Sequence, residues 1–409
     1  MKVAMVSEHA SPLAVLGGAD AGGQNVHVAE LSAALTRRGH TVTVYTRRDD
    51  PELPERVDMP QGYTVVHVPA GPAEHLPKDE LLRHMGPFAQ FLDAQWSADR
   101  PDVTHAHFWM SGVATQLAAR HLGIPAVQTF HALGVVKRRH QGANDTSPEE
   151  RRRLEAMVAR GASWVAATCT DEVFELVRLG RSRARMSVVP CGVDVDIFTP
   201  EGPVAPRGHR HRIVSVGRFV PRKGFDVVIR ALPAIPDTEL VIVGGPEKSQ
   251  LSKDKEACRL LRLADELGVA DRVYLYGSVA RGDMPAILRS ADVVACTPWY
   301  EPFGIVPLEA MACGVPVVAA AVGGMLDTVV HDVTGQLVEP NSPAHVAAAI
   351  KQLVRDEFLR QSLGAAGRDR AKARYSWDRI AADTLRIYDR LVPPERLVPA
   401  APASKLSSG

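Results

Sequence analysis

Residues 213–225 read Ile-Val-Ser-Val-Gly-Arg-Phe-Val-Pro-Arg-Lys-Gly-Phe, a short apolar run followed at once by a loop that contains glycine and proline. Ile213–Val216 is too short for a helix and rich in β-branched residues, so it predicts a buried strand. Arg218 and Lys223 follow this strand and therefore lie at its carboxyl end. Because ligands of open α/β sheets bind at the carboxyl ends of strands, the loop predicts a binding site.

Similar apolar runs alternate with helical patterns along almost the whole chain. In one helical pattern, Gln24–Arg38, the residues Val28, Leu31 and Leu35 share a face, and Gly39 then ends the helix. Alternation of this kind predicts the α/β class, with parallel sheets covered by helices on both faces. The expected strands are Val3–Val6, Thr41–Tyr45, Tyr63–Val68, Val103–Ala106, Ala126–Thr129, Trp164–Ala167, Ile213–Val216, Leu240–Val243, Val273–Tyr276, Val293–Ala295 and Val315–Ala319.

A segment rich in glycine and proline, Pro190–Pro206, separates two series of strands and predicts a linker. Two doubly wound, Rossmann-like domains are therefore expected, facing each other across a cleft. We expect an N-terminal domain over residues 1–195 and a C-terminal domain over 196–375. Residues 376–391 predict a last amphipathic helix, and the tail 392–409, rich in Pro, Ala and Ser, predicts disorder.

The composition argues against several classes of function. The chain has 409 residues, with 48 Lys and Arg against 47 Asp and Glu, so it lacks the basic field of a protein whose main partner is nucleic acid. No apolar run approaches the roughly 18 residues of a membrane span, so no membrane insertion is expected. Met1–Glu8 predicts a short strand instead of a signal peptide. The five cysteines form no CxxC pair, which favours reduced thiols and a cytoplasmic protein.

A glycine-rich loop, residues 17–25, follows the first expected strand and opens the first expected helix. Backbone N–H groups of such a loop are suited to binding phosphate. The loop is neither GxGxxG nor GxxxxGK[ST], so the standard dinucleotide and P-loop interpretations fail, and a nicotinamide dehydrogenase is disfavoured. A flexible turn that needs positive φ angles is the alternative.

Charged residues of the second half predict a site for a diphosphate and a sugar. Arg218 supplies a planar fork and Lys223 a compact charge, a combination suited to two adjacent phosphates. Glu301 and Glu309 bracket a turn with Pro and Gly, and a helix that begins near Gly304 would direct its N-terminal N–H groups at a ligand. Glu309 would lie about one turn along that helix, where a carboxylate can accept both hydroxyls of a ribose. Solvated surface charges are the alternative interpretation.

Two sets of residues look like metal ligands. Asp194-Val195-Asp196 has the form of a DxD metal clamp, but it lies in the expected linker and is interpreted as a turn. His105 and His107 share a face of a strand without a carboxylate or cysteine nearby in the sequence, so packed or hydrogen-bonded histidines are expected. The sequence therefore predicts no metal site.

In combination, these motifs resemble those of a known family, the retaining glycosyltransferases of group 1 (family 4), which have the GT-B fold. The match runs from Met1 to about Leu391. Within that family, residues 17–23 and 130–137 are most similar to the branch of mycothiol-pathway glycosyltransferases and sucrose-phosphate synthases. The motifs that carry the resemblance are Gly217-Arg218 with Lys223-Gly224, Glu301 with Glu309, Gly22-Gly23, His105-Ala106-His107, Thr129-Phe130-His131, Pro190–Asp194 with Phe198, and Ser376-Trp377.

The resemblance implies a metal-independent, retaining enzyme that needs no cofactor and uses a nucleotide-diphosphate sugar. UDP is the preferred nucleotide because the resembled branch uses it; GDP and ADP stay open. The implied catalytic residues are His131, Arg218, Lys223 and Glu301. The implied donor-binding residues are Gly22, Gly23, Phe303, Gly304, Ile305 and Glu309. The terminal helix, 376–391, is implied to cross back onto the N-terminal domain, which would bind the acceptor while the C-terminal domain binds the nucleotide sugar.

The resembled branch binds an acceptor phosphate with a Lys, a Tyr, a Thr and an Arg. Lys78 and the run that ends at Arg153 match the charged pair, whereas Phe108 and Ala132 replace the two hydroxyl residues. The acceptor residues expected here are Asn25, Lys78, Phe108, Lys137 and Arg153.

Because the hydroxyl donors are missing, the expected acceptor is a polyhydroxylated small molecule, a cyclitol or sugar that need not carry phosphate. An inositol-phosphate N-acetylglucosaminyltransferase of mycothiol synthesis and a noncatalytic nucleotide-sugar sensor are the alternatives. A homodimer is compatible with the sequence.

Overall fold

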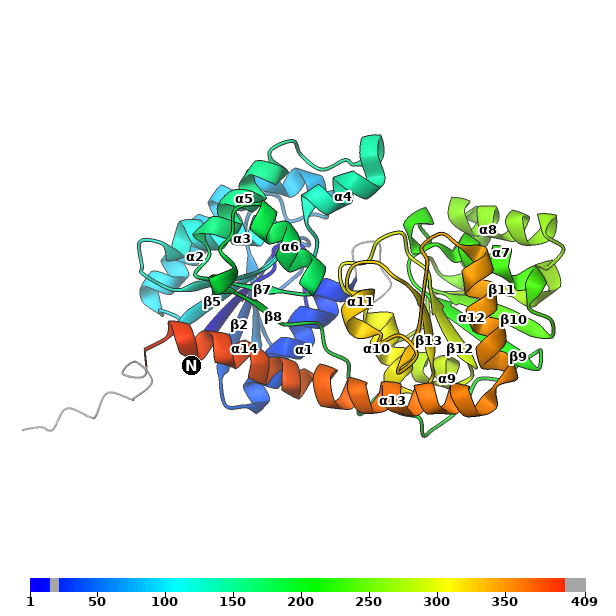
Figure 1. The fold of residues 1–409 in the computed structure, drawn as a ribbon. Helices are drawn as coiled ribbons and strands as arrows, with labels where there is room; N and C mark the ends of the chain where they lie inside the picture. Colours follow the sequence, from blue (N-terminus) through cyan, green and yellow to red (C-terminus); the bar gives the residue numbers. More distant parts are fainter. Residues whose placement is uncertain (15–21, 394–409) are drawn as a thin grey trace, which may run out of the picture.

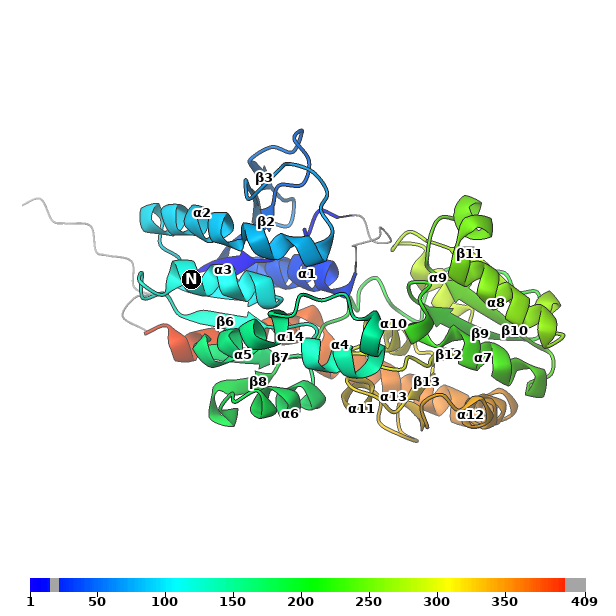
Figure 2. The same ribbon diagram turned by 90° about the horizontal axis from the view of Figure 1, so that it is seen from above.

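The computed structural model describes residues 1–14 and 22–393. These residues form two α/β domains, each built around a parallel sheet with helices on both faces (Figure 1). Seen from above, the domains lie side by side, and loops from the facing edges of both sheets meet between them (Figure 2). The predicted positions 15–21 of the glycine loop and 394–409 of the tail lie outside the described residues.

The N-terminal domain has a sheet in which the described strands follow the order β3-β4-β2-β1-β5-β6-β7-β8. All pairs are parallel except β3 with β4. The strands are β1 (Lys2–Val6), β2 (Thr41–Arg47), β3 (Arg56–Asp58), β4 (Thr64–Val68), β5 (Val103–His107), β6 (Ala126–Thr129), β7 (Trp164–Ala167) and β8 (Met186–Val188). The helices are α1 (Gly23–Arg37), α2 (Met85–Ala98), α3 (Trp109–Ala119), α4 (Gly134–Gln141), α5 (Arg151–Gly161) and α6 (Thr170–Arg178).

The C-terminal domain has a parallel sheet in the order β11-β10-β9-β12-β13-β14. Its strands are β9 (His211–Val216), β10 (Thr238–Val243), β11 (Val273–Gly277), β12 (Val293–Cys296), β13 (Val317–Ala320) and β14 (Gly335–Val338). Its helices are α7 (Phe225–Ala231), α8 (Lys255–Glu266), α9 (Met284–Arg289), α10 (Ile305–Ala312), α11 (Met325–Thr328), α12 (Pro343–Arg355) and α13 (Glu357–Tyr375). A last helix, α14 (Trp377–Leu391), follows.

The strand order determines where each domain can bind a ligand. Counted from its own first strand, the C-terminal sheet runs 3-2-1-4-5-6, the order of dinucleotide-binding folds. In such sheets the strand order reverses between the first and fourth strands, and a crevice opens at their carboxyl ends. Here that position lies between β9 and β12, and in the N-terminal sheet it lies between β1 and β5.

Every strand expected from the sequence is present, with ends that differ by at most two residues. Three described strands, β3, β8 and β14, were not predicted. β3 and β8 have three residues each, and β14 begins at Gly335, so none of the three carries a strong apolar signal. β3 and β8 also lie at the edges of the N-terminal sheet, where pairing on one side is enough to form a strand.

The chain crosses between the domains twice. Residues 190–206 lead from the first domain to the second, and α13 leads back to α14 beneath the N-terminal sheet (Figure 1). Ile380 and Ile387 of α14 are buried in the N-terminal core together with Val28 and Leu31. Burial of each isoleucine stabilises this docking by roughly 1.5–3 kcal/mol. The two crossings touch, because Val193 N donates to Tyr375 O at 2.8 Å.

Among the described residues, no helix combines the length and the apolar character that a bilayer span requires.

Candidate active site

A cavity of about 500 Å³ lies between the two domains, at the carboxyl ends of both sheets. The loops after β9 and β12 and the start of α10 line it from the C-terminal domain. The start of α1 and the loops after β5 and β6 line it from the N-terminal domain. Arg218, Lys223, Glu301, Glu309 and His131 all line this cavity, so the structure brings together residues that are up to 178 positions apart (309 − 131).

The conformation of the loop after β9 depends on a glycine, Gly224. Gly224 has φ +69°, and a Cβ at that position would lie 1.9 Å from the carbonyl oxygen of Thr297 in the loop after β12. Thr297 Oγ1 in turn donates to Gly224 O at 2.8 Å. The close approach of these two loops directs Lys223 into the cavity from a short 3₁₀ turn, Pro221–Lys223.

Lys223 Nζ lies 2.5 Å from Glu301 Oε2, and both side chains are largely buried. Burial alone would raise the pKa of Glu301, but Lys223 and two nearby arginines outweigh burial and hold this pKa below its usual value. Glu301 is therefore a carboxylate at neutral pH, held next to an ammonium group. Arg218 lines the same part of the cavity.

The start of α10 faces the cavity with Phe303, Gly304 and Ile305. Gly304 has φ +85°, and a Cβ there would lie 2.8 Å from Met325 Cε, so glycine is required at this turn. Gly323 and Gly324 pack behind the turn: Gly324 N donates to Glu301 O at 3.0 Å. Gly323 and Gly324 do not line the cavity; a Cβ on either would clash with the backbone of residues 301–303.

Glu309 lies one turn into α10 and is buried. Burial raises its pKa to about 7, although the Arg281 guanidinium, 3.7 Å from Glu309 Oε1, opposes the shift. Arg281 follows β11 and also lies 3.8 Å from Glu30 on α1. One arginine thus connects the site's buried carboxylate with the opposite domain.

On the N-terminal side, His131 follows β6 with φ +60°, an uncommon backbone conformation for a histidine. A hydrogen bond of 3.0 Å joins its Nε2 to Nδ1 of His107, the last residue of β5. Burial, and then the neighbouring histidines, lower the pKa of both imidazoles well below the usual value. Both rings are therefore neutral at pH 7.

Lys78 and Phe108 meet at the other end of the cavity. Phe108 has φ +80°, and its ring lies 3.8 Å below Lys78 Nζ, a cation–π contact. Burial lowers the pKa of Lys78 to about 8; Glu8 opposes the shift, and Arg151 and Lys137 add to it. Lys78 Nζ forms no hydrogen bond or ion pair with the part of the chain that the structure describes.

One predicted acceptor residue lies outside the cavity. Arg153 is exposed on α5 and does not line the cavity. Arg151 is buried instead, with its guanidinium 5.2 Å from the Phe108 ring centre and 2.7 Å from Glu155 Oε1. Two residues turn a helix by about 200°, so only one of the two arginines can face the domain interior.

Two further acceptor residues have local partners. Asn25 lines the cavity, but its Oδ1 accepts from Gly22 N at 3.0 Å and its Nδ2 donates to Ser11 O. Lys137 does not line the cavity; its Nζ contacts Asp145 at 3.0 Å and Ser147 Oγ at 2.9 Å. Gly22 and Gly23 both line the cavity, and a Cβ on Gly23 would lie 3.2 Å from Ile305 Cδ1 across the domain boundary.

The DxD-like segment forms a turn. Asp194 Oδ1 accepts from the backbone N of Asp196 and of Ile197, both at 3.0 Å, so this carboxylate stabilises the local backbone.

Comparison with known proteins identifies the family. Residues 21–197 match the family model described as Glycosyltransferase Family 4, and residues 203–370 match the one described as Glycosyl transferases group 1. The D-inositol 3-phosphate glycosyltransferase of Xylanimonas cellulosilytica is 40% identical over 407 residues, which cover 95% of this chain and 96% of that protein. The chain belongs to the group 1 glycosyltransferases.

Solved structures agree with this assignment. The sucrose-phosphate synthase of Thermosynechococcus elongatus is 31% identical, covers 95% of this glycosyltransferase and 98% of its own chain, and superimposes with a TM-score of 0.86. HepE of Anabaena, solved in complex with UDP, is 20% identical and has the same fold, with a TM-score of 0.72 and coverage of 94% and 99%. The fold is therefore GT-B, as the motifs predicted.

Sequence reasoning missed one residue that lines the site of this glycosyltransferase, Arg281, and one that packs behind it, His27. Arg281 lies in the loop after β11 without a motif, and only the tertiary approach of this loop to α10 brings it to Glu309. His27 lies on α1, and its ring centre is 5.0 Å from that of His131 and 5.4 Å from that of His107. The helical period placed its helix correctly, but no local signal showed that His27 meets a histidine at the end of β5 and another in the loop after β6.

Proposed function

We propose that this glycosyltransferase transfers a sugar from a nucleotide-diphosphate sugar, with UDP as the preferred nucleotide, to a cyclitol that carries phosphate, and that it retains the anomeric configuration. The observation that carries the proposal is the pair Arg218 and Lys223 at the crevice between β9 and β12, on the cavity that both domains line. A solved protein of the same fold, HepE, was crystallised with UDP and with UDP-glucose, which supports the choice of nucleotide.

The chemical step breaks the anomeric C–O bond to the diphosphate, and negative charge grows on the departing oxygen. In the proposal, Arg218 and Lys223 lie next to that charge before the reaction begins. Cations fixed in place act more strongly on the transition state than on the substrate, because no reorganisation is needed when charge develops. Two side-chain cations supply the charge that a metal ion would otherwise bring, so the proposed transfer is metal-independent.

Retention requires the acceptor oxygen to bond to the same face of the sugar that the diphosphate leaves. In the proposed step, a diphosphate oxygen takes the proton of the acceptor hydroxyl as the new C–O bond forms, so the nucleotide leaves protonated and no further base is needed. Neutral His131 is available to hydrogen-bond a donor sugar hydroxyl near the reacting carbon. The N–H groups at the start of α10 and the carboxylate of Glu309 are assigned to the sugar and the ribose, respectively.

The cations at the acceptor end favour a phosphate-bearing acceptor. Lys78 is a half-buried ammonium that forms no ion pair with a carboxylate in the described residues, and Arg151 adds positive charge close to Phe108. Burial disfavours the charged form of Lys78 and lowers its pKa to about 8. An anion that binds beside this lysine stabilises the charged form, and this stabilisation favours binding of a phosphate. The preference drawn from Phe108 and Ala132 for an acceptor without phosphate is therefore reversed. The curated relatives named D-inositol 3-phosphate glycosyltransferase support this choice.

A screen of nucleotide sugars against cyclitols with and without phosphate, read by mass spectrometry, tests the proposal. We expect product from a UDP-sugar and a cyclitol phosphate in the presence of EDTA, with the anomeric configuration of the donor retained by NMR. The matched variant Lys78→Met should raise the KM for the phosphorylated acceptor and leave the KM for the donor almost unchanged. Nucleotide binding without any transfer would contradict the enzyme assignment, and equal use of the free cyclitol would contradict the phosphate site.

A further inference from the structure

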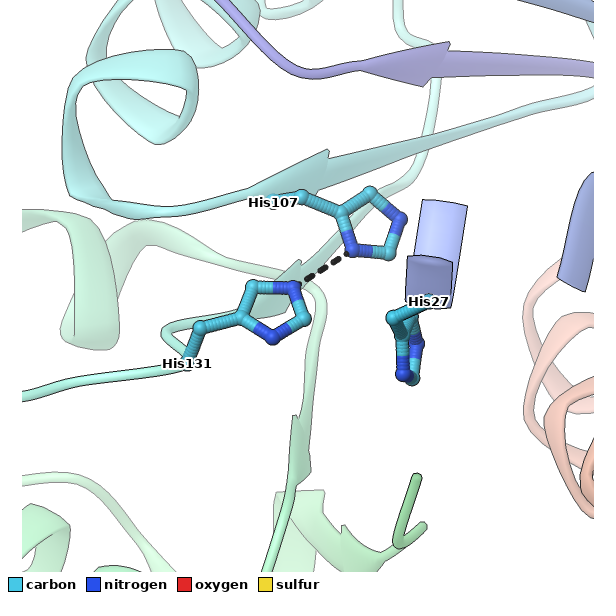
Figure 3. Close-up of side chains that lie close together, drawn as sticks. All are labelled: His27, His107 and His131. Carbon is cyan, nitrogen blue, oxygen red and sulfur yellow. Dashed lines mark hydrogen bonds between the residues drawn. The ribbon is translucent and has the colours of Figure 1, made fainter. Parts of the chain in front are cut away.

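Three histidines from distant parts of the sequence meet beside the cavity. His27 comes from α1, His107 from the end of β5 and His131 from the loop after β6, and their rings lie around one small space (Figure 3). Each histidine has one ring nitrogen that lies within 4.8 Å of a ring nitrogen of each of the other two. In the described residues, 1–14 and 22–393, no other group of three potential ligands comes this close.

Some ring nitrogens of this cluster have no hydrogen-bond partner in the described part of the chain. His107 Nε2 is buried and has no hydrogen-bond partner in the described part of the chain. His27 Nδ1 lies 3.0 Å from Cys191 Sγ, which leaves Nε2 of the same ring for another partner. The nearby His105 differs, because both of its nitrogens have partners, Tyr388 and Thr129. The three clustered imidazoles therefore have fewer hydrogen bonds to lose than His105 when an ion binds.

We infer that His27, His107 and His131 form a binding site for a transition-metal cation of the Zn²⁺ type, and that a bound cation blocks the cavity side of His131. The ion would replace the proton that His107 Nδ1 and His131 Nε2 share across 3.0 Å. His27 would supply the third nitrogen. His131 lines the cavity, whereas His27 and His107 do not, so His131 is the ligand through which the site meets the cavity.

The donor set fits a cation of this class. Tetrahedral Zn²⁺ binds imidazole nitrogens at about 2.0–2.1 Å, which separates two such ligands by roughly 3.3 Å. The observed separations, 3.0 Å for one pair and at most 4.8 Å for the others, need shifts of about 1.5 Å or less. Nitrogen ligands without a carboxylate favour Zn²⁺, Ni²⁺ or Cu²⁺ over Mg²⁺ and Ca²⁺, which prefer oxygen. The Nδ1 of His27 bonded to Cys191 resembles the outer hydrogen bonds that orient metal-ligating histidines.

Binding of the cation and its effect on the enzyme are separable. The site itself depends only on the three imidazoles. The inhibitory effect of the cation rests on the proposed function, in which His131 contacts the donor sugar. The cation would replace the hydrogen bond to His107 that holds the His131 ring in place. A direct binding measurement therefore tests the site even if the assigned transfer reaction fails.

Competition of the EDTA-treated full-length protein against a chromophoric Zn²⁺ chelator measures binding directly. We expect one Zn²⁺ per chain at this site, and His27→Phe should weaken its affinity at least about tenfold, the lower range seen when metal-site contacts are lost. Phenylalanine keeps a ring against Trp377, 5.5 Å away in the native contact, so the core stays filled. The matched control is His345→Gln, which removes an exposed histidine of α12. Bound Co²⁺ should show the visible spectrum of a tetrahedral nitrogen site, and this spectrum should be lost in His27→Phe.

Nucleotide release measured with Zn²⁺ and then with EDTA tests the effect on turnover. Zn²⁺ should inhibit the native enzyme reversibly, and the concentration for half inhibition should rise at least about tenfold in His27→Phe. His27 does not line the cavity, so the variant should keep its activity in EDTA. Equal Zn²⁺ affinity of the native protein and His27→Phe would overturn the site. Unchanged inhibition in that variant would overturn the proposed blocking of His131.

Discussion

Lys223 has two anionic neighbours in the proposed reaction: the carboxylate of Glu301, 2.5 Å away, and the diphosphate of the donor. The carboxylate fixes the ammonium group in the cavity before the donor binds. The pair also keeps Glu301 ionised, since the lysine outweighs the effect of burial on its pKa. The net contribution of this pair to stability is small, because the cost of desolvating two largely buried charges offsets most of their attraction. Its main consequence is therefore expected in turnover.

Replacement of Lys223 tests this expectation. Lys223→Met removes the charge and keeps the length of the side chain, and we expect kcat to fall by about 10²–10³, as when one preorganised group is lost from a site of developing charge. Lys223→Arg should keep a larger share of activity. Nucleotide release gives kcat, and thermal unfolding should show that Tm changes little. A variant that loses Tm and kcat together would assign Lys223 a structural role instead.

Glu309 predicts a pH dependence of donor binding. Its pKa of about 7 lies above the ordinary 4.5, so the carboxylate is half ionised near neutrality. The ionised form accepts ribose hydroxyls, so the donor KM should fall as the pH rises through 7 and increase below it. For folding the sign is opposite: a raised pKa stabilises the folded state at low pH, and this stabilisation is lost as the pH rises through about 7.

Glu309→Gln provides the comparison. The amide stays neutral at every pH, so the variant should show a high donor KM without a step near pH 7. KM measured in steps from about pH 6 to pH 8 would show the difference. A step of equal size in native enzyme and variant would assign the titration to another group.

Helix α14 is tied to the first domain by a buried polar chain. Thr129 Oγ1 donates to Ala166 O at 3.0 Å, so it must accept from Nε2–H of His105. His105 Nδ1 then accepts from the hydroxyl of Tyr388 on α14, at 2.7 Å. Burial lowers the pKa of His105 to about 3, which agrees with this neutral tautomer.

Tyr388→Phe should cost about 1–3 kcal/mol of stability, because it leaves the buried Nδ1 of His105 without a donor. The midpoint of urea denaturation measures the loss, and kcat of the remaining folded enzyme should be nearly unchanged. Tyr274→Phe is the control: its hydroxyl is exposed and bonds a backbone oxygen, so the midpoint should barely move. An equal shift in both variants would contradict the tautomer assigned to His105.

The secondary structure elements were predictable because their signal is local. β6 and β7 begin and end where their apolar runs do, and α1 differs by one residue at each end. Strands such as β3 were missed because pairing partners, and not the three residues themselves, hold them in the sheet. Element ends shifted where polar residues, Arg47 or His211, continue a strand whose neighbours are already paired.

The same distinction separates the predicted from the unpredicted parts of the site. Arg218, Lys223 and Glu301 follow strands, so topology alone brings them to one edge. Arg281 and His27 carry no such signal, and the choice between Arg151 and Arg153 depends on the helical phase of α5 against its neighbours. Contacts across packed elements were thus out of reach of a single sequence.

Arg281 contacts Glu309 in one domain and Glu30 in the other, so its replacement should change the pKa of Glu309 as well as the contact between the domains. Arg281→Met removes the cation that lowers the pKa of Glu309, so the step in donor KM should move to higher pH. Glu30→Gln is the matched variant, since it breaks the contact with α1 and leaves Arg281 beside Glu309. KM against pH for both variants separates the two roles. A shift of the same size in Glu30→Gln would mean that the domain contact, and not Arg281's charge, sets the pKa.

The two chain crossings have a mechanical consequence. Val193 and Tyr375 bond to each other, and a Cβ on Gly192 would lie 2.5 Å from the indole of Trp377, so the crossings are fastened together at one place. Because the chain connects the domains only at this one place, they can rotate about it like the leaves of a hinge but cannot slide apart. His140 of the first domain stacks on Tyr300 of the second, with ring centres 5.1 Å apart, so a rotation that opens the cavity must separate these two rings.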